Sequence, residues 1–442
     1  MKTLYYHANI ITGVRERGKL LLPGGYLLVE DGVLADVGVC GDDRLPEAQV
    51  RHDLAGAIVT PGMISAHCHF YGQFVRGMAL KTPVLNWQQV LSRMWWKVDK
   101  ALDAEQIYYS TVMGLIDGLK AGTTTYFDHQ ASPNCIDGSL DIIESAMQRL
   151  GGRGCLAYEV TDRDGKERAN AGIAENVRYL RKHRSDRGAF KGLFGLHASY
   201  TLSDETLARC AAEGAALGAG FHIHMAEAQA DLCDSFRQYD MGVVERLDRF
   251  GILNGRTITA HNVHVGKPQF EIMRRAGITA AHNCQSNTNN AVGCCPVTDL
   301  MDAGVHVALG GDGYTYDLFA ELGFAAILQH LRTGDCAAFP GAQVLDMAFT
   351  NNRRLAAQTF GYDLGVLCKG AAADFLLLDY DPPTPLCEDN VLSHMTAGFS
   401  GHVRSVVVGG ETVVRDRRLT RADEKELTAR CRAQAQRLWD KL

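Results

Sequence analysis

The chain has 442 residues, 46% of them hydrophobic, which is enough for a barrel-sized domain with a large buried core. Its net charge of −6 is small and no Lys/Arg tract stands out, so neither nucleic acid nor an anionic membrane is expected as a partner. The start, MKTLYYHANIITG, has no apolar signal segment, and no long uncharged apolar stretch follows it. The sequence therefore predicts a soluble, cytoplasmic protein.

Both ends of the chain read as β-structure. Near the N-terminus, YLLVEDGVLADVG alternates apolar and polar residues around a turn at Asp31-Gly32. Near the C-terminus, ADFLLLDY and VRSVVVGGETVVRD show the same pattern, with a turn at Gly409-Gly410. We expect residues 1–58 and 365–420 to build one small β-sandwich domain together, and the charged residues 421–442 to form a terminal helix.

The middle of the chain, residues 59–364, alternates short apolar runs with helix-period segments. The runs are AIVTPGMISAH, TTTYFDH, GCLAYEV, GLFGLH, GFHIH, TITAH, ITAAH and VHVALGGD. Eight such repeats predict an α/β fold, a (β/α)8 TIM-like barrel. The alternative, an open doubly wound sheet, lacks a GxGxxG after any strand and does not suit the β-rich flanks.

Histidines and acids stand at or just after these runs, where barrel enzymes place their chemistry. His67 and His69 share one face of a strand because side chains alternate, and both can reach one metal. His224 ends a later run and Asp312 follows the last. Together they predict a His3Asp site with a place for water, for one divalent metal: zinc first, iron or manganese as alternatives. His222 is a rival ligand on the face of His224, deeper in the strand.

Two further residues complete the predicted catalytic set. Glu227, three residues after His224, is suited to moving a proton between water and a substrate nitrogen. His261 is suited to polarising an oxygen beside the metal. A two-metal site would need a bridging Lys at the end of the fourth strand, but Lys191 lies at the other end and His197 occupies the mouth. We therefore expect one metal, with His197 facing the substrate.

The stretches PGMISAHCH, HIHMAE, TAH and GGDG resemble the amidohydrolase superfamily, in its mononuclear deaminase branch. HCHFYGQFVRGM, MWWKVDKALD, DHQASPNCIDGSL, NCQSNTNNAVG and PPTPLCEDN are similar to the aminohydrolase family called SsnA, and the likeness covers essentially the whole chain. The resemblance implies metal ligands His67, His69, His224 and Asp312, a proton shuttle at Glu227 and a transition-state donor at His261. It also implies substrate contacts by His197, His129, Gln73, Asn283 and Asn287. For His129, a role in capping a helix or in supporting a ligand side chain stays open.

The predicted function is hydrolytic deamination of a nitrogen heterocycle, a purine or a purine-derived compound. The first alternative is a mononuclear cyclic amide hydrolase that opens a purine-derived or hydantoin-like ring. A second is a scaffold without activity, which the full ligand set argues against. We expect a homo-oligomer, a dimer or tetramer as in family members. The 13 cysteines, odd in number and without a CxxC pair, are expected to be reduced and to act mainly in packing.

Overall fold

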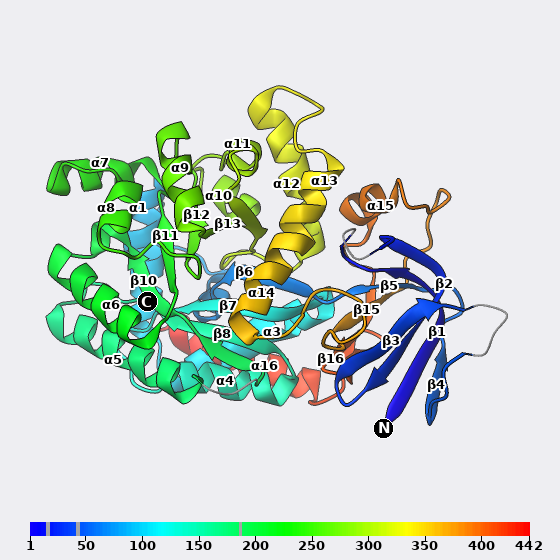
Figure 1. The fold of residues 1–442 in the computed structure, drawn as a ribbon. Helices are drawn as coiled ribbons and strands as arrows, with labels where there is room; N and C mark the ends of the chain where they lie inside the picture. The colour runs from blue at the N-terminus through cyan, green and yellow to red at the C-terminus, as the bar shows by residue number, and fades with distance from the viewer. Residues whose placement is uncertain (15–17, 41–44, 185–187) are drawn as a thin grey trace.

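The structure is a computed structural model that describes residues 1–14, 18–40, 45–184 and 188–442. Figure 1 shows a barrel wrapped by helices and, beside it, a sheet in which blue N-terminal strands lie next to orange C-terminal ones. The two ends of the chain thus meet outside the central domain, as the sequence predicts.

The barrel wall consists of short parallel strands that are almost fully buried. They are β6 (Met63–Cys68), β7 (Thr123–Gln130), β8 (Arg153–Tyr158), β10 (Phe194–Ala198), β11 (Phe221–Met225), β12 (Ile258–His261), β13 (Thr279–His282) and β14 (His306–Leu309). They form two sheets, β6-β7-β8-β9 with the short β9 (Phe190–Gly192), and β10-β11-β12-β13-β14. Single parallel bridges, Val160 to Leu196 and Cys68 to Asp312, connect the sheets at both seams. All eight expected runs form strands, and the TIM-like barrel is confirmed.

Helices cover the outside of the barrel between successive strands. The principal ones are α3 (Ala104–Ala121), α4 (Ser139–Leu150), α5 (Lys166–Lys182), α6 (Asp204–Leu217), α8 (Val243–Arg249), α9 (Lys267–Ala276), α11 (Val297–Asp302), α12 (Leu318–Thr333) and α14 (Asn352–Phe360). The first of them begins with a capping box between Asp103 and Gln106 and ends at Gly122, whose φ of 95° suits glycine. The chain therefore turns back into the next strand at a residue that tolerates this geometry.

Further short helices lie over the ends of the barrel. They are η2 (Phe70–Val75), α1 (Trp87–Val90), η3 (Leu91–Trp95), α2 (Trp96–Ala101), η4 (Ser199–Thr201), α7 (Gln229–Tyr239), α10 (Cys284–Asn289), α13 (Gly341–Leu345) and η5 (Asp346–Asn351). Several of them follow strands directly, so their first residues stand at the barrel mouth. The segment MWWKVDKALD forms η3 and α2, and it contributes side chains to the cavity described below.

The outer sheet has nine strands drawn from both ends of the chain. They are β1 (Lys2–Ile11), β2 (Leu21–Glu30), β3 (Val33–Val39), β4 (Val50–Asp53), β5 (Ile58–Pro61), β15 (Phe375–Leu378), β16 (Val403–Val408), β17 (Glu411–Arg415) and β18 (Arg418–Leu419). The ends join where β15 pairs with β5. Residues of both ends, such as Leu27 and Phe375, share one apolar core. Since β5 ends at Pro61, the sheet extends slightly past the predicted limit at residue 58.

Two contacts fix the remaining parts of the chain to the barrel. The terminal helix α16 (Glu424–Trp439) packs on α3, and Trp439 Nε1 donates to the Phe74 carbonyl. At the start of β8 the buried guanidinium of Arg153 forms an ion pair with Asp374, at 3.1 Å, just before β15. The short helix α15 (Val391–Gly398) precedes β16. The outer sheet is thus held to the barrel by a buried ion pair as well as by the chain.

All 13 cysteines are free thiols, as expected. Within the described ranges, no helix is both long and apolar enough to span a membrane.

Candidate metal centre and active site

The predicted metal ligands meet at the C-terminal ends of the barrel strands. His67 lies on β6 and His69 directly follows it, His224 lies on β11, and Asp312 stands three residues beyond β14. His67 is fully buried, and His69 and His224 are nearly so. The barrel thus collects side chains that are far apart in the sequence into one buried cluster.

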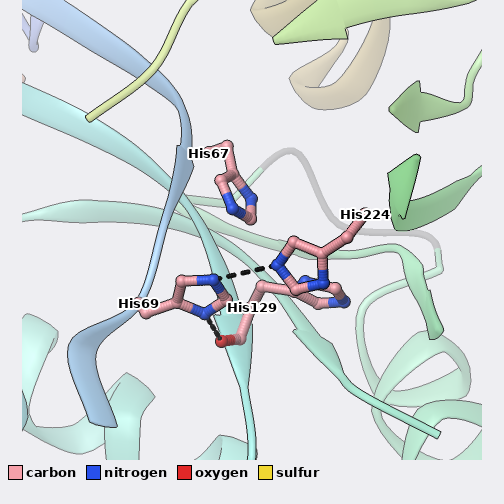
Figure 2. A group of neighbouring side chains, drawn as sticks. All are labelled: His67, His69, His129 and His224. Carbon is pink, nitrogen blue, oxygen red and sulfur yellow. Dashed lines mark hydrogen bonds between the residues drawn. The ribbon is translucent and has the colours of Figure 1, made fainter. Parts of the chain in front are cut away.

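Hydrogen bonds assign the tautomers of two of these rings. His69 Nδ1 lies 2.6 Å from the His129 carbonyl and His224 Nδ1 lies 2.8 Å from the His197 carbonyl. Since a carbonyl only accepts, both Nδ1 atoms carry the proton, and each Nε2 presents a lone pair. Figure 2 shows these two Nε2 atoms facing each other, at a distance of 3.1 Å. Two facing lone pairs need a shared proton or cation between them.

The cluster has the chemistry of a cation site. Asp312 Oδ1 lies 3.1 Å from His69 Nε2 and 3.3 Å from His67 Nε2. His67 Nε2 is buried and has no hydrogen-bond partner in the part of the chain that is described. Burial opposes the charged form of His69, but Asp312 and Glu159 outweigh it and raise its pKa to about 9. The cluster therefore attracts positive charge, and its imidazole and carboxylate donors fit one divalent ion such as zinc.

His129 is a second neighbour of this cluster. The donor atoms of His67, His69, His129 and His224 lie within 4.8 Å of one another, and those of His67, His261 and Asp312 do so as well. The ring of His129 is fully buried and stacks on that of His69 at 5.7 Å between centroids, and neither of its nitrogens has a hydrogen-bond partner among the described residues. His129 and Asp312 are therefore rivals for the place of fourth ligand.

His222 lies next to the cluster and contacts the ring of His67. Its Nε2 lies 2.8 Å from His67 Nδ1, and its ring stacks on that of His129 at 4.4 Å between centroids. If His67 uses Nε2 as a ligand, its Nδ1 carries the proton and donates to His222. This is the usual arrangement around a metal-bound histidine, whose other nitrogen is held by a hydrogen bond. His222, the rival ligand in the sequence, is placed to orient His67.

Glu227 and His261 stand beside the cluster. Glu227 Oε1 lies 3.8 Å from His261 Nε2, and His261 Nδ1 lies 2.8 Å from Asn287 Oδ1. Burial, together with the charges of Asp312 and Asp231, raises the pKa of Glu227 well above its usual value. Burial likewise works against the ionised form of Asp312, but the contacts with the rings of His67 and His69 bring its pKa well below the usual value. The pKa values of the two carboxyls are thus shifted in opposite directions, an arrangement typical of acid–base pairs.

The backbone around these residues is strained. Ala226, His261 and Asp312 all have positive φ, of 50°, 76° and 55°, a conformation that side chains disfavour. Such strain persists where the surrounding structure imposes it, often at functional sites. A Cβ on Gly310, directly after β14, would lie 2.4 Å from Asn283 Oδ1, so only glycine lets the chain lie this close to Asn283.

A cavity of about 410 Å³ opens above the cluster. Its lining includes His69, Gln73, Glu159, Arg163, His197, His224, Glu227, His261, Ser286 and Asp312, with Tyr71, Trp87, Trp95, Trp96, Tyr200 and Tyr314 as aromatic walls. The predicted substrate contacts Gln73 and His197 face this cavity. Asn283 is fully buried outside its lining, and its amide has no hydrogen-bond partner among the described residues.

Sequence reasoning missed several residues of the cavity. Glu159, directly after β8, lies 3.3 Å from His69 Nδ1, and burial raises its pKa to about 8 against the charges of His69 and Arg163. The guanidinium of Arg163 pairs with Asp99 and Asp164, and Ser286 donates to Asp312. The run GCLAYEV has an acid as its last residue but one, close to where other runs carry a histidine, and that signal points to Glu159.

The amidohydrolase family model matches residues 58–413, and the chain belongs to this family. The chain is 32% identical to the 5-methylthioadenosine/S-adenosylhomocysteine deaminase of Desulfitobacterium hafniense (strain Y51), over 92% of both chains. It is 30% identical to the 5'-deoxyadenosine deaminase of Methanosarcina mazei, over 94% of this chain and 93% of that one. A zinc-bound adenosine deaminase from Xanthomonas campestris has the same fold, with a TM-score of 0.88, 24% identity and coverage of 99% and 98%. The finer likeness to SsnA stays a prediction.

Proposed function

We propose that this protein is a metal-dependent hydrolytic deaminase that replaces an amino group on a nitrogen heterocycle, a purine or a purine-derived compound, by a carbonyl. The observation that carries the proposal is the meeting of the donor atoms of His67, His69, His224 and Asp312 in one buried cluster, with Glu227 and His261 beside it. Relatives with deaminase names, one of them at 32% identity over nearly the whole chain, support the same reaction class.

His67, His69, His224 and Asp312 are proposed to hold one divalent metal, with zinc the best fit and iron or manganese as substitutes. When bound, such a metal supplies Lewis acidity that makes water a nucleophile near neutral pH. His222 keeps His67 in the tautomer that presents Nε2.

The acid–base roles follow from the geometry. Asp312, ionised, accepts a proton from the attacking water, while Glu227, neutral, donates its proton to the ring nitrogen beside the amino-bearing carbon. His261, whose Nδ1–H donates to Asn287 Oδ1, is proposed to act in its protonated form, so that Nε2 donates to the developing oxyanion, as preorganised donors do. The C–O bond forms and the bond to the exocyclic nitrogen breaks. The leaving nitrogen takes the proton held by Asp312 and departs as ammonia, and the remaining hydroxyl proton returns to Glu227 as the carbonyl forms.

The test is analysis of products by mass spectrometry after the zinc-loaded protein is incubated with aminopurines, aminopterins, oxidised purines and dihydro heterocycles. Conversion of an amino group to a carbonyl, with ammonia in equal amount, is expected. A product heavier by one whole water would instead support the alternative, ring opening of a cyclic amide. A metal-free protein that no added metal activates would support an inactive scaffold.

The proposal extends to matters of assembly and contact. Gln73 and His197 contact the substrate from the wall of the cavity. His129 and Asn283 also contribute to substrate binding, although neither lines the cavity. The protein works in the cytoplasm as a dimer or tetramer, independently of nucleic acid and membranes. Light scattering after gel filtration measures the assembly, and a single monomeric species would contradict that part.

A further inference from the structure

Glu159 is the buried acid of the cavity that the mechanism above does not use. Only 4% of the residue is exposed, and its Oε1 has no hydrogen-bond partner in the described part of the chain. The nearest cation-forming groups are the rings of His69, at 3.3 Å, and His129, at 3.6 Å. The guanidinium of Arg163 is directed to Asp99 and Asp164 instead. Oε1 thus faces the metal cluster, whereas Oε2 faces His197, where a ligand can supply its hydrogen-bond partner.

His197 faces Glu159 as a second acceptor. The hydroxyl of Thr201 donates its one proton to the Ala198 carbonyl, at 3.0 Å, so it accepts from His197 Nδ1 at 2.8 Å. That hydrogen bond places the proton on Nδ1 and leaves a lone pair on Nε2. His197 Nε2 lies 3.9 Å from Glu159 Oε2. Two acceptors at this distance on a cavity wall are complementary to a hydrogen-bond donor between them.

A second metal ion is a poorer occupant of this place. The donor atoms of Glu159, His197 and His224 do lie within 4.8 Å of one another. However, His224 Nδ1 is bonded to the His197 carbonyl, and its Nε2 faces His69 Nε2 in the metal cluster. Without His224, only two ligands remain for a second ion, which is fewer than zinc takes.

We infer that Glu159 and His197 together bind a ring N–H of the substrate, and that the substrate is an amino–oxo heterocycle of the guanine type rather than an adenine nucleoside. This inference rests on the proposed function, because it takes the cluster as the place of the reacting carbon. The pair lies next to that cluster, so it contacts the ring close to the amino-bearing carbon.

The two kinds of base differ at that position. In guanine, the carbon that carries the amino group stands between N3, an acceptor for the proton of Glu227, and N1–H, a donor for Glu159. In an adenine nucleoside, N9 carries the sugar, the ring nitrogens N1, N3 and N7 are acceptors, and only the amino group of the base, which leaves, donates. An adenine ring would therefore leave Glu159 and His197 unpaired in a dry pocket, and a site built for an N–H strongly rejects a ligand without it.

The decisive measurement is binding, because it does not depend on turnover. Zinc-loaded Glu227→Gln protein is dialysed to equilibrium against radiolabelled guanine, 2,6-diaminopurine or adenosine. Guanine has a ring N–H and an oxo group, whereas 2,6-diaminopurine has a bare ring nitrogen and a second amino group in their places. We expect guanine to bind about tenfold to a hundredfold more tightly, the cost of leaving a buried acceptor without a partner. Adding Glu159→Gln, whose amide can donate to His197, is expected to abolish most of this preference.

Two further variants distinguish a loss of guanine recognition from a loss of the folded structure. His197→Phe, which removes the acceptor at similar size, is expected to reduce the same guanine preference. Glu144→Gln changes an equally buried carboxyl that contacts Tyr179 and Lys182 outside the cavity, and it is expected to leave the preference unchanged. Zinc content and melting temperature of each variant show whether it is folded.

Three results would overturn the inference. One is equal or weaker binding of guanine than of 2,6-diaminopurine. Another is a guanine preference that persists unchanged in a folded Glu159→Gln variant. The third is a preference for adenosine that depends on Glu159, which would assign the carboxyl to ribose hydroxyls. Ammonia release from adenosine by the unmodified enzyme would, in that case, leave the proposed deamination standing while the guanine-type assignment falls.

Discussion

The two halves of the barrel mouth differ in how they present their polar groups. In the reaction half, on β6, β11, β12 and β14, every ring nitrogen that faces the cluster is fixed by a bond on its other side. In the recognition half, on β7, β8 and β10, neither ring nitrogen of His129 has a hydrogen-bond partner among the described residues, and Glu159 Oε1 has none either. The comparison teaches that the chemistry is preorganised by the protein, whereas recognition is left to be completed by the ligand.

The largest effect should come from the fourth metal ligand, for which Asp312 of the reaction half and His129 of the recognition half are the two candidates. Asp312→Asn is expected to lose bound zinc and to lower turnover by about a thousandfold or more, since several kcal/mol of transition-state stabilisation depend on the metal. His129→Asn is expected to retain zinc. Metal analysis of the two purified proteins measures this, and zinc loss in His129→Asn with retention in Asp312→Asn would exchange their roles.

The next effect concerns proton transfer within the reaction half. Glu227→Gln keeps the size of the side chain but removes the proton that it donates, so turnover is expected to fall by about a hundredfold to ten-thousandfold. Zinc content should not change, because Glu227 is not a proposed ligand. Steady-state kinetics with metal analysis tests this, and near-normal turnover in the variant would remove the shuttle role.

A smaller effect is expected beneath the cluster. His222→Phe removes the acceptor for His67 Nδ1 and preserves most of the ring volume, so zinc affinity should fall by about tenfold to a hundredfold. Competition with a chelator gives the affinity, and His222→Gln, which keeps an acceptor, serves as the rescue variant. Unchanged affinity in a folded His222→Phe protein would contradict the orienting role.

The smallest effect tests how far His261 depends on its support. Asn287→Ala removes one hydrogen bond to His261 Nδ1, so kcat should fall by about threefold to tenfold with KM little changed. Asn287→Asp, which keeps the acceptor, should recover most of the rate. A variant in which KM rises and kcat stays constant would instead make Asn287 a substrate contact.

The sequence predicted the reaction half far better than the recognition half. His67 and His69 are two residues apart and share one face of a strand. His224 lies near the end of its strand and Glu227 follows three residues later, so short spacing in the sequence is enough to relate each pair. Glu159 has no such partner in the sequence, and its neighbours His69, His129 and His197 come from three other strands. The orientation of His222 toward His67 also depends on the closure of the barrel, which no local pattern encodes.

Deamination by water is tested most directly by turnover in oxygen-18 water, with the zinc-loaded enzyme and the heterocycle that it converts. The account predicts one oxygen-18 atom in the product at the carbon that lost its amino group, and one ammonia for each product. A product that keeps its nitrogen and gains a whole labelled water, or ammonia release without label in the product, would contradict hydrolytic deamination at this site.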